Sequence, residues 1–146
     1  AAGNWILGNL IGTDPTGMLD RGNSSDGILV NNVPATTIGG PAPGAGNLIS
    51  GNGGSGIELS GTNAALTLIQ GNRLGTDASG QAALANTANG VLIIANARSN
   101  QIVANVIAFN DAGQQFGLRK IAGGLLYHLV FLCQLKIHGK RCITML

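Results

Sequence analysis

The chain has 146 residues, of which 45% are hydrophobic, 10% charged and 3% aromatic, and it carries 24 glycines and a net charge of +2. A hydrophobic content near the globular average excludes a fully disordered chain, and the scarcity of charges argues against helices stabilised by surface ion pairs. Few aromatic residues and a small net charge argue against a dedicated nucleic-acid-binding protein.

The composition changes near residue 113. Residues 1–113 hold all six acidic residues and three arginines, whereas residues 114–146 hold the other five basic residues, both histidines, both cysteines and no acid. The net positive charge therefore comes from the end of the chain and not from its main part. We predict two regions, a body over residues 1–113 and an atypical basic and apolar tail over residues 114–146.

Short apolar segments follow one another along the body. Each has three to five residues rich in Ile, Val and Leu between Gly, Asn, Asp, Ser or Pro, which is typical of short strands joined by turns. No stretch keeps a helical periodicity without an interrupting Gly or Asn. In chain order, the segments are centred near Leu10, Ile28, Ile38, Leu48, Ile57, Leu68, Val91, Ile102 and Val106.

The body also contains an internal repeat with an offset of 63 residues. Residues 8–17 (GNLIGTDPTG) return as residues 71–80 (GNRLGTDASG), and residues 26–30 return as residues 89–93. A related run, residues 46–52, returns as residues 104–110. Sequence repetition of this kind is typical of solenoid proteins.

Strands this short fit a coiled solenoid of parallel strands better than a β-sandwich. With roughly 20 to 23 residues in each turn, the body would make about five coils. On this spacing, Ile28, Leu48 and Leu68 are expected to share one interior column.

The recurring Gly-Asn pairs are interpreted as the corners of the coil. Gly adopts positive φ without steric cost, and Asn tolerates the left-handed region better than most residues. Stacked asparagines can also hydrogen-bond to one another along the axis of a parallel stack. The residues assigned to these turns and to this ladder are Gly8, Asn9, Gly46, Asn47, Gly71, Asn72 and Asn105.

These motifs resemble those of a known family. The run Gly-Asn-x-Ile-Gly-Thr-Asp-x-x-Gly, with Gly-Val/Ile-x-Ile and Gly-Asn-Leu-Ile-Ser-Gly-Asn, resembles the right-handed parallel β-helix repeats of large bacterial secreted and surface proteins. Those repeats share their coil with the pectin-lyase-like superfamily. The resemblance covers residues 3–110 and implies an all-β, right-handed parallel β-helix at the cell surface or outside the cell.

The resemblance also implies a class of function. Repeats of this family are mostly scaffold, so we expect a non-catalytic structural or binding module that makes adhesive or carbohydrate contacts. The expected partners are a polysaccharide or another cell-surface ligand, and exposed coil ends make end-to-end self-association plausible. The alternative is a fragment of a polysaccharide lyase or glycoside hydrolase whose catalytic coils lie outside this segment.

The acidic residues of the body do not suggest a catalytic pair. Asp14 and Asp77 occupy equivalent repeat positions that we place roughly three turns apart, too far for the carboxylate pair of a glycosidase. Each is expected to accept backbone N–H groups in its own turn. Glu58 lies at an outward strand position and is interpreted as part of a solvated face.

Calcium is the one cofactor that the acids suggest. Asp14, Asp20 and Asp26 lie in one loop region and are the candidate ligands, since Ca²⁺ prefers several oxygen ligands. The second copy of the motif keeps only the first of these acids, so a calcium site would occur once. The body has no His, Cys or Lys, which excludes a Cys-His nucleophile, a zinc cluster or a lysine base there.

The tail allows three interpretations. Its apolar run, residues 121–135, is shorter than the roughly 20 residues that a membrane span needs. It is a cap over the open end of the coil, an interfacial or membrane-seeking segment, or a truncated or out-of-frame stretch that is not native repeat sequence. The chain begins inside a repeat without Met or a signal peptide, so a missing leader says nothing about secretion.

Overall fold

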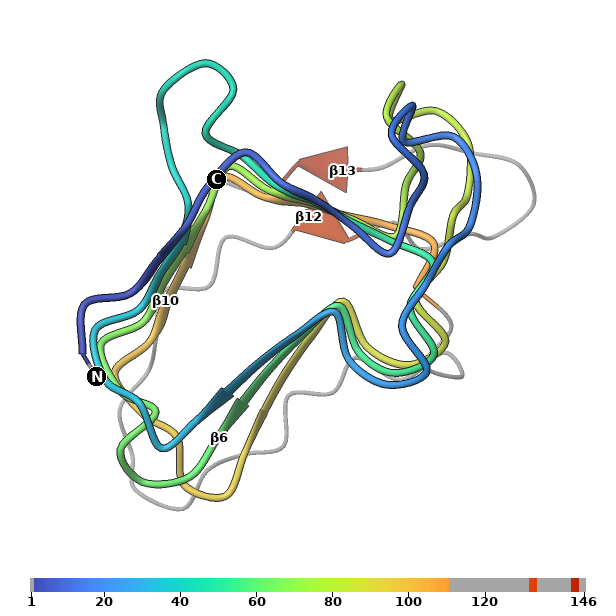
Figure 1. The fold of residues 1–146 in the computed structure, drawn as a ribbon. Helices are drawn as coiled ribbons and strands as arrows, with labels where there is room; N and C mark the ends of the chain where they lie inside the picture. The colour runs from blue at the N-terminus through green and yellow to red at the C-terminus, as the bar shows by residue number, and fades with distance from the viewer. Residues whose placement is uncertain (1, 111–131, 134–142, 145–146) are drawn as a thin grey trace.

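Residues 2–110 of the computed structural model form a parallel β-solenoid without helices (Figure 1). Three parallel sheets make the walls of the coil: a first sheet in the order β1–β4–β7–β10, a second in the order β2–β5–β8–β11 and a third in the order β3–β6–β9. Besides these residues, the structure describes only residues 132–133 and 143–144. The all-β parallel solenoid is the fold class that the sequence predicts.

Each strand has only two to four residues. Turns interrupt the chain so often that no longer strand can form, and the stack rather than the single strand supplies the pairing. The strands of the coil are β1 (Trp5–Ile6), β2 (Leu10–Ile11), β3 (Ile28–Asn31), β4 (Thr37–Gly39), β5 (Leu48–Ile49), β6 (Ile57–Ser60), β7 (Leu68–Gln70), β8 (Arg73–Leu74), β9 (Val91–Ile94), β10 (Gln101–Val103) and β11 (Val106–Ile107).

The described part makes about three coils, so the expectation of about five coils is wrong. In the first sheet, Thr37 pairs with Leu68 and Leu68 with Gln101, which places successive coils 31 and 33 residues apart in sequence. The cause is the number of walls. Each coil runs through three strands. Three apolar segments about ten residues apart therefore make up one coil, whereas the expected shorter coil would contain only two.

The expected interior column of Ile28, Leu48 and Leu68 is also wrong, because these residues belong to three different sheets. Ile28 does face the interior, where it lies above Ile57 and Val91 in the third sheet. Leu48 and Leu68 instead lie on the outer faces of their sheets. The first and second sheets supply the other interior columns, which contain Ile6, Ile38, Ile69 and Ile102, and Ile11, Ile49, Leu74 and Ile107.

The corner between the second and third sheets is long in one coil and short in the next. Between the second and third sheets, the first coil carries a protruding loop over residues 13–20 and the third coil carries an equivalent loop over residues 76–83. The second coil turns directly through Ser50 and Gly51. The 63-residue sequence repeat is therefore a pair of unequal coils, and the two loops protrude together from one corner (Figure 1).

Two further short strands belong to the tail region. β12 (Leu132–Cys133) and β13 (Ile143–Thr144) pair with each other in antiparallel fashion. The remaining tail residues, and with them the cap, interfacial and out-of-frame interpretations, lie outside the described residues.

Candidate functional site

A ladder of asparagines runs along the corner between the first and second sheets. Asn9 donates from Nδ2 to Oδ1 of Asn47, Asn47 to Asn72, and Asn72 to Asn105, at 3.0, 2.9 and 2.9 Å. Each Oδ1 also accepts the backbone N–H of the asparagine one coil earlier. The asparagine side chains thus satisfy polar groups that would otherwise be orphaned inside the coil.

A second ladder, which the sequence analysis missed, runs along the corner between the second and third sheets. Asn23, Asn52, Asn86 and Asn110 are linked in that order by Nδ2–Oδ1 hydrogen bonds of 3.1, 2.8 and 2.8 Å. The signal was present but irregular in spacing. Asn9 and Asn23 lie 14 positions apart, whereas Asn47 and Asn52 lie five apart, because only alternate coils carry the inserted loop.

The two inserted loops are built around Asp14 and Asp77. Oδ1 of Asp14 accepts the backbone N–H groups of Met18 and Leu19, both at 3.0 Å, and Oδ2 accepts the Thr16 hydroxyl at 2.7 Å. This confirms the prediction that the aspartate organises its own turn. The Thr16 hydroxyl and the backbone donors lower the pKa of Asp14 from 3.8 to about 2, because they stabilise the carboxylate.

Asp77 repeats this arrangement in the third coil. Its Oδ1 accepts the backbone N–H groups of Gln81 and Ala82, and the Ser79 hydroxyl donates to the carboxylate at 2.7 Å. These bonds, the one from Ser79 above all, lower the pKa of Asp77. Both aspartates are therefore held as anions whose oxygens are already engaged.

The two loops touch each other although a whole coil lies between their strands. The backbone N–H of Ala78 donates to the carbonyl of Gly17 at 2.9 Å. The expectation that 63 residues correspond to three turns is therefore wrong: the loops are two coils apart and meet above the short corner. Leu48 lies beneath them and is only 5% exposed although it points outward.

The three calcium candidates are engaged by different backbone groups. Asp14 holds its own loop, Oδ1 of Asp20 accepts the backbone N–H of Gly22 at 2.8 Å, and Oδ1 of Asp26 accepts that of Ser55 at 2.7 Å. Within residues 2–110, no three acidic, His or Cys side chains come together in a group that could hold a metal ion. Calcium binding by Asp14, Asp20 and Asp26 stays a prediction.

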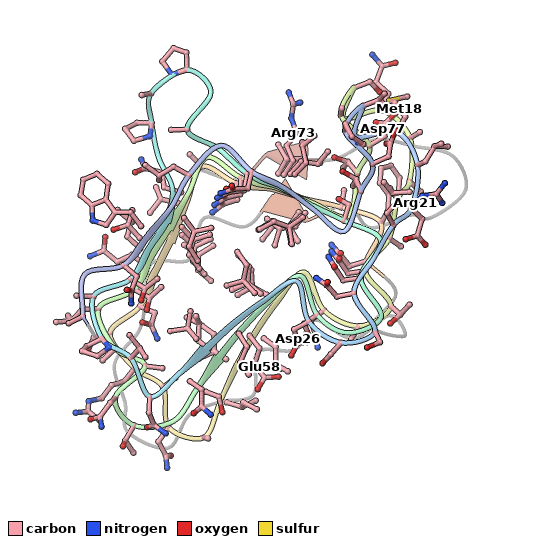
Figure 2. All side chains as sticks on the ribbon, viewed as in Figure 1. Met18, Arg21, Asp26, Glu58, Arg73 and Asp77 are labelled. Carbon is pink, nitrogen blue, oxygen red and sulfur yellow. The ribbon has the colours of Figure 1, made fainter. Side chains whose placement is uncertain are left out.

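Asp26 and Glu58 approach each other from adjacent coils, which the sequence analysis did not foresee. Figure 2 shows both side chains on the outside of the coil near the start of the third sheet. Glu58 lies between Leu29 and Leu92 of the neighbouring strands. Burial, and secondarily the charge of Asp26, raises the pKa of Glu58. Glu58 faces outward as predicted, but it is only partly solvated.

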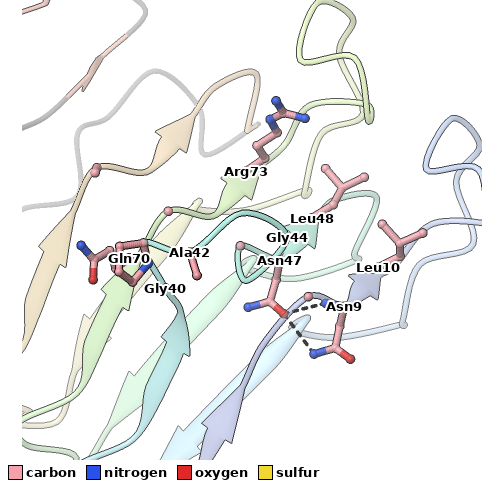
Figure 3. Close-up of a pocket in the computed structure, with 14 residues that line it drawn as sticks. Asn9, Leu10, Gly40, Ala42, Gly44, Asn47, Leu48, Gln70 and Arg73 are labelled. Atoms are coloured by element: carbon pink, nitrogen blue, oxygen red, sulfur yellow. Dashed lines mark hydrogen bonds between the residues drawn. The ribbon is translucent and has the colours of Figure 1, made fainter.

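A groove lies on the outer face of the second sheet. Its volume is about 540 Å³, and it is bounded by the loop over residues 40–46 and by the strands beside it (Figure 3). Leu10, Leu48 and Arg73 occupy the paired outward positions of β2, β5 and β8 along its floor. Five glycines line the groove, so much of its surface is backbone.

Of the described residues that line this groove, Arg73 is the one that carries a charge. Its side chain is exposed, points away from the coil interior (Figure 2), and donates from Nη1 to the carbonyl of Ala78 at 2.7 Å. An arginine held by a single carbonyl keeps further donors for a ligand. The groove therefore offers an aliphatic floor, backbone polar groups and one positive charge.

Comparison of the chain with protein-family models, with curated proteins and with solved structures gives no match. None of the described segments is a helix long and apolar enough to cross a bilayer. What the structure itself shows is a parallel β-solenoid of about three coils, with ladders at two corners and a groove on one outer face.

Proposed function

We propose that this chain is a non-catalytic binding module of a bacterial secreted or cell-surface β-helix protein, and that it contacts carbohydrate through the groove on the second sheet. The proposal includes membership of the pectin-lyase-like group of right-handed coils, which rests on the repeat motif together with the coil. The expected location is extracellular or at the cell surface.

The observation that carries the proposal is the groove of about 540 Å³ between the 40–46 loop and the second sheet. Its floor is made of paired strand positions, so Leu10, Leu48 and Arg73 are held at fixed spacing on a rigid wall. A row of aliphatic and hydrogen-bonding groups on a rigid wall suits an extended chain of sugar rings, whose faces are apolar and whose edges are polar.

The aspartates of the two inserted loops support a binding role without catalysis. The carboxylates of Asp14 and Asp77 are occupied by hydroxyl and backbone donors inside their loops. Their lowered pKa values make them poor general acids near neutral pH. Neither carboxylate is free to serve as a base or nucleophile, because its loop depends on it.

Titration calorimetry of the chain against neutral and acidic polysaccharides tests the proposal. Arg73→Ala is expected to weaken binding about ten-fold, the effect of losing one charge-assisted hydrogen bond of roughly 1.4 kcal/mol. Arg98→Ala is the matched control, because Arg98 is also exposed and also donates from Nη1 to one carbonyl, that of Thr62. Equal loss from both variants, or no binding by the unmodified chain, contradicts the proposal.

A second candidate function follows from the proximity of Asp26 and Glu58. Glycoside hydrolases use two carboxyl groups, one of them protonated, and a raised pKa at Glu58 beside Asp26 matches that division of roles. Release of reducing ends by the chain, abolished in Glu58→Gln, would favour this hydrolase alternative. Binding without any product release favours the module.

A further inference from the structure

The described coils contain two Asn-Gly steps, Asn52-Gly53 and Asn89-Gly90, in opposite surroundings. An asparagine followed by glycine is chemically labile, because glycine has no side chain to hinder attack of its nitrogen on the asparagine amide carbon. Whether that attack occurs depends on how firmly the fold holds the two residues. The two Asn-Gly steps can therefore be compared within one chain, one as the reactive site and the other as its internal reference.

Asn52 is held on every side. It is fully buried, its Nδ2 donates to Oδ1 of Asn86 at 2.8 Å, and its Oδ1 accepts Nδ2 of Asn23 at 3.1 Å. The backbone N–H of Gly53, the would-be attacking group, donates to the carbonyl of Asn23 at 2.8 Å. Reaction at Asn52 therefore requires a local opening of the second ladder.

Asn89 lacks this support. Its side chain is half-buried, and among residues 2–110 its amide group has no hydrogen-bond partner. The N–H of Gly90 likewise donates to no group in that part of the chain. Within the described coils, only the carbonyls of these two residues are engaged, by the N–H groups of Gly56 and Ile57 at 2.8 and 3.0 Å.

We propose that Asn89 is a site of spontaneous deamidation and that Asn52 is protected by the ladder. The Gly90 nitrogen attacks Cγ of Asn89, ammonia leaves, and a cyclic succinimide forms. One water then opens the ring at either carbonyl and gives aspartate or isoaspartate. The net change replaces an amide by a carboxylate and adds one negative charge.

The repeat tolerates one of these products and not the other. Asp26 occupies the position equivalent to Asn89 under the 63-residue offset, so an aspartate is compatible with this corner. Isoaspartate instead lengthens the main chain by one methylene and moves the carbonyl that Gly56 binds. It therefore disturbs the pairing that begins β9 on β6. Deamidation would loosen the third coil as the protein ages.

Peptide mapping by mass spectrometry tests the proposal on the intact chain. The folded protein is incubated at mildly alkaline pH and then cleaved with trypsin, for which Arg73 and Arg98 bracket Asn89 while Arg21 and Arg73 bracket Asn52. Conversion at Asn89 is expected to be at least roughly ten-fold faster than at Asn52, because opening the ladder costs more than about 1.4 kcal/mol.

The same measurement in urea, where neither site is held, is expected to bring the two rates within about two-fold of each other. The control variant Asn89→Gln is expected to show no conversion at position 89 and no loss of melting temperature during incubation. Equal rates at the two sites in the folded chain would overturn the proposal. So would a folded chain in which Asn89 stays intact while the unfolded chain converts.

Discussion

Replacing Asn72 by alanine is expected to be among the most destabilising single changes in the coil. Asn72 is 1% exposed. Its Oδ1 accepts the backbone and side-chain N–H groups of Asn47 at 3.0 and 2.9 Å, and its Nδ2 donates to the carbonyls of Ile38 and Gln70 and to Asn105. Alanine would remove all of these bonds at once and leave the buried N–H of Asn47 without an acceptor.

The magnitude follows from what remains unpaired. A buried backbone group that loses its partner costs roughly 1 to 3 kcal/mol, and Asn72→Ala orphans the N–H of Asn47. It also removes the Nδ2 bonds to the carbonyl of Ile38 and to Oδ1 of Asn105, each worth about 1 kcal/mol. We expect the free energy of unfolding to fall by about 4 kcal/mol, a large share of the 5 to 15 kcal/mol of a typical domain.

Urea unfolding followed by far-ultraviolet circular dichroism measures this loss. Asn9→Ala is the matched control, because Asn9 stands at the exposed end of the same ladder and its side chain donates only to Leu7 and Asn47. The control should lose about 1 kcal/mol or less. If Asn72→Ala loses no more than Asn9→Ala, the ladder does not stabilise the coil as argued.

Four further changes test separate features of the coil. Gly71→Ala should lower the free energy of unfolding by about 2 kcal/mol or more in urea titrations, since φ is +68° and the new Cβ would lie 2.5 Å from a neighbouring carbonyl oxygen; an unchanged midpoint would refute this. Thr67→Val should raise the free energy of unfolding by about 1 kcal/mol in the same titrations, because the buried Thr67 hydroxyl has no hydrogen-bond partner in the part of the chain that the structure describes; a loss would show that the hydroxyl is satisfied. The carboxylate of Asp14 favours the folded state, so the melting temperature should hold steady above pH 3.8 and fall as the pH drops towards about 2. Asp14→Asn should reduce that dependence, and an identical pH profile for the variant would contradict the stabilising role of the carboxylate. Burial raises the pKa of Glu58, so its ionised form disfavours folding, and Glu58→Gln should raise the melting temperature at neutral pH but much less at pH values well below 4.5; a lower melting temperature at neutral pH contradicts this.

The local elements of the coil were readable from the sequence because they depend on neighbours in the chain. Short aliphatic segments bounded by Gly and Asn predict strands and corners, and strands do occur near every segment that the sequence marked, from β2 to β11. The aspartate turns were readable for the same reason, since Asp14 binds N–H groups only four and five residues ahead of it.

The register between coils could not be predicted from the sequence, because it depends on the number of residues in each coil. The 63-residue repeat hides one coil with a long corner and one with a short corner, and dividing it into three equal turns placed Leu48 and Leu68 in the interior. The same error concealed the second ladder, and it concealed the approach of Asp26 to Glu58, which lie 32 positions apart and one coil apart.

The bond between the two protruding loops has a direction. Ala78 in the third coil donates its backbone N–H to the carbonyl of Gly17 in the loop two coils earlier. Under the 63-residue offset, the position of Ala78 is taken by Pro15 in the first loop. Proline has no N–H to give, so the first loop can receive this bond but cannot pass it backwards. The bond between these two loops therefore runs in one direction, and proline at position 15 prevents the first loop from donating in the same way.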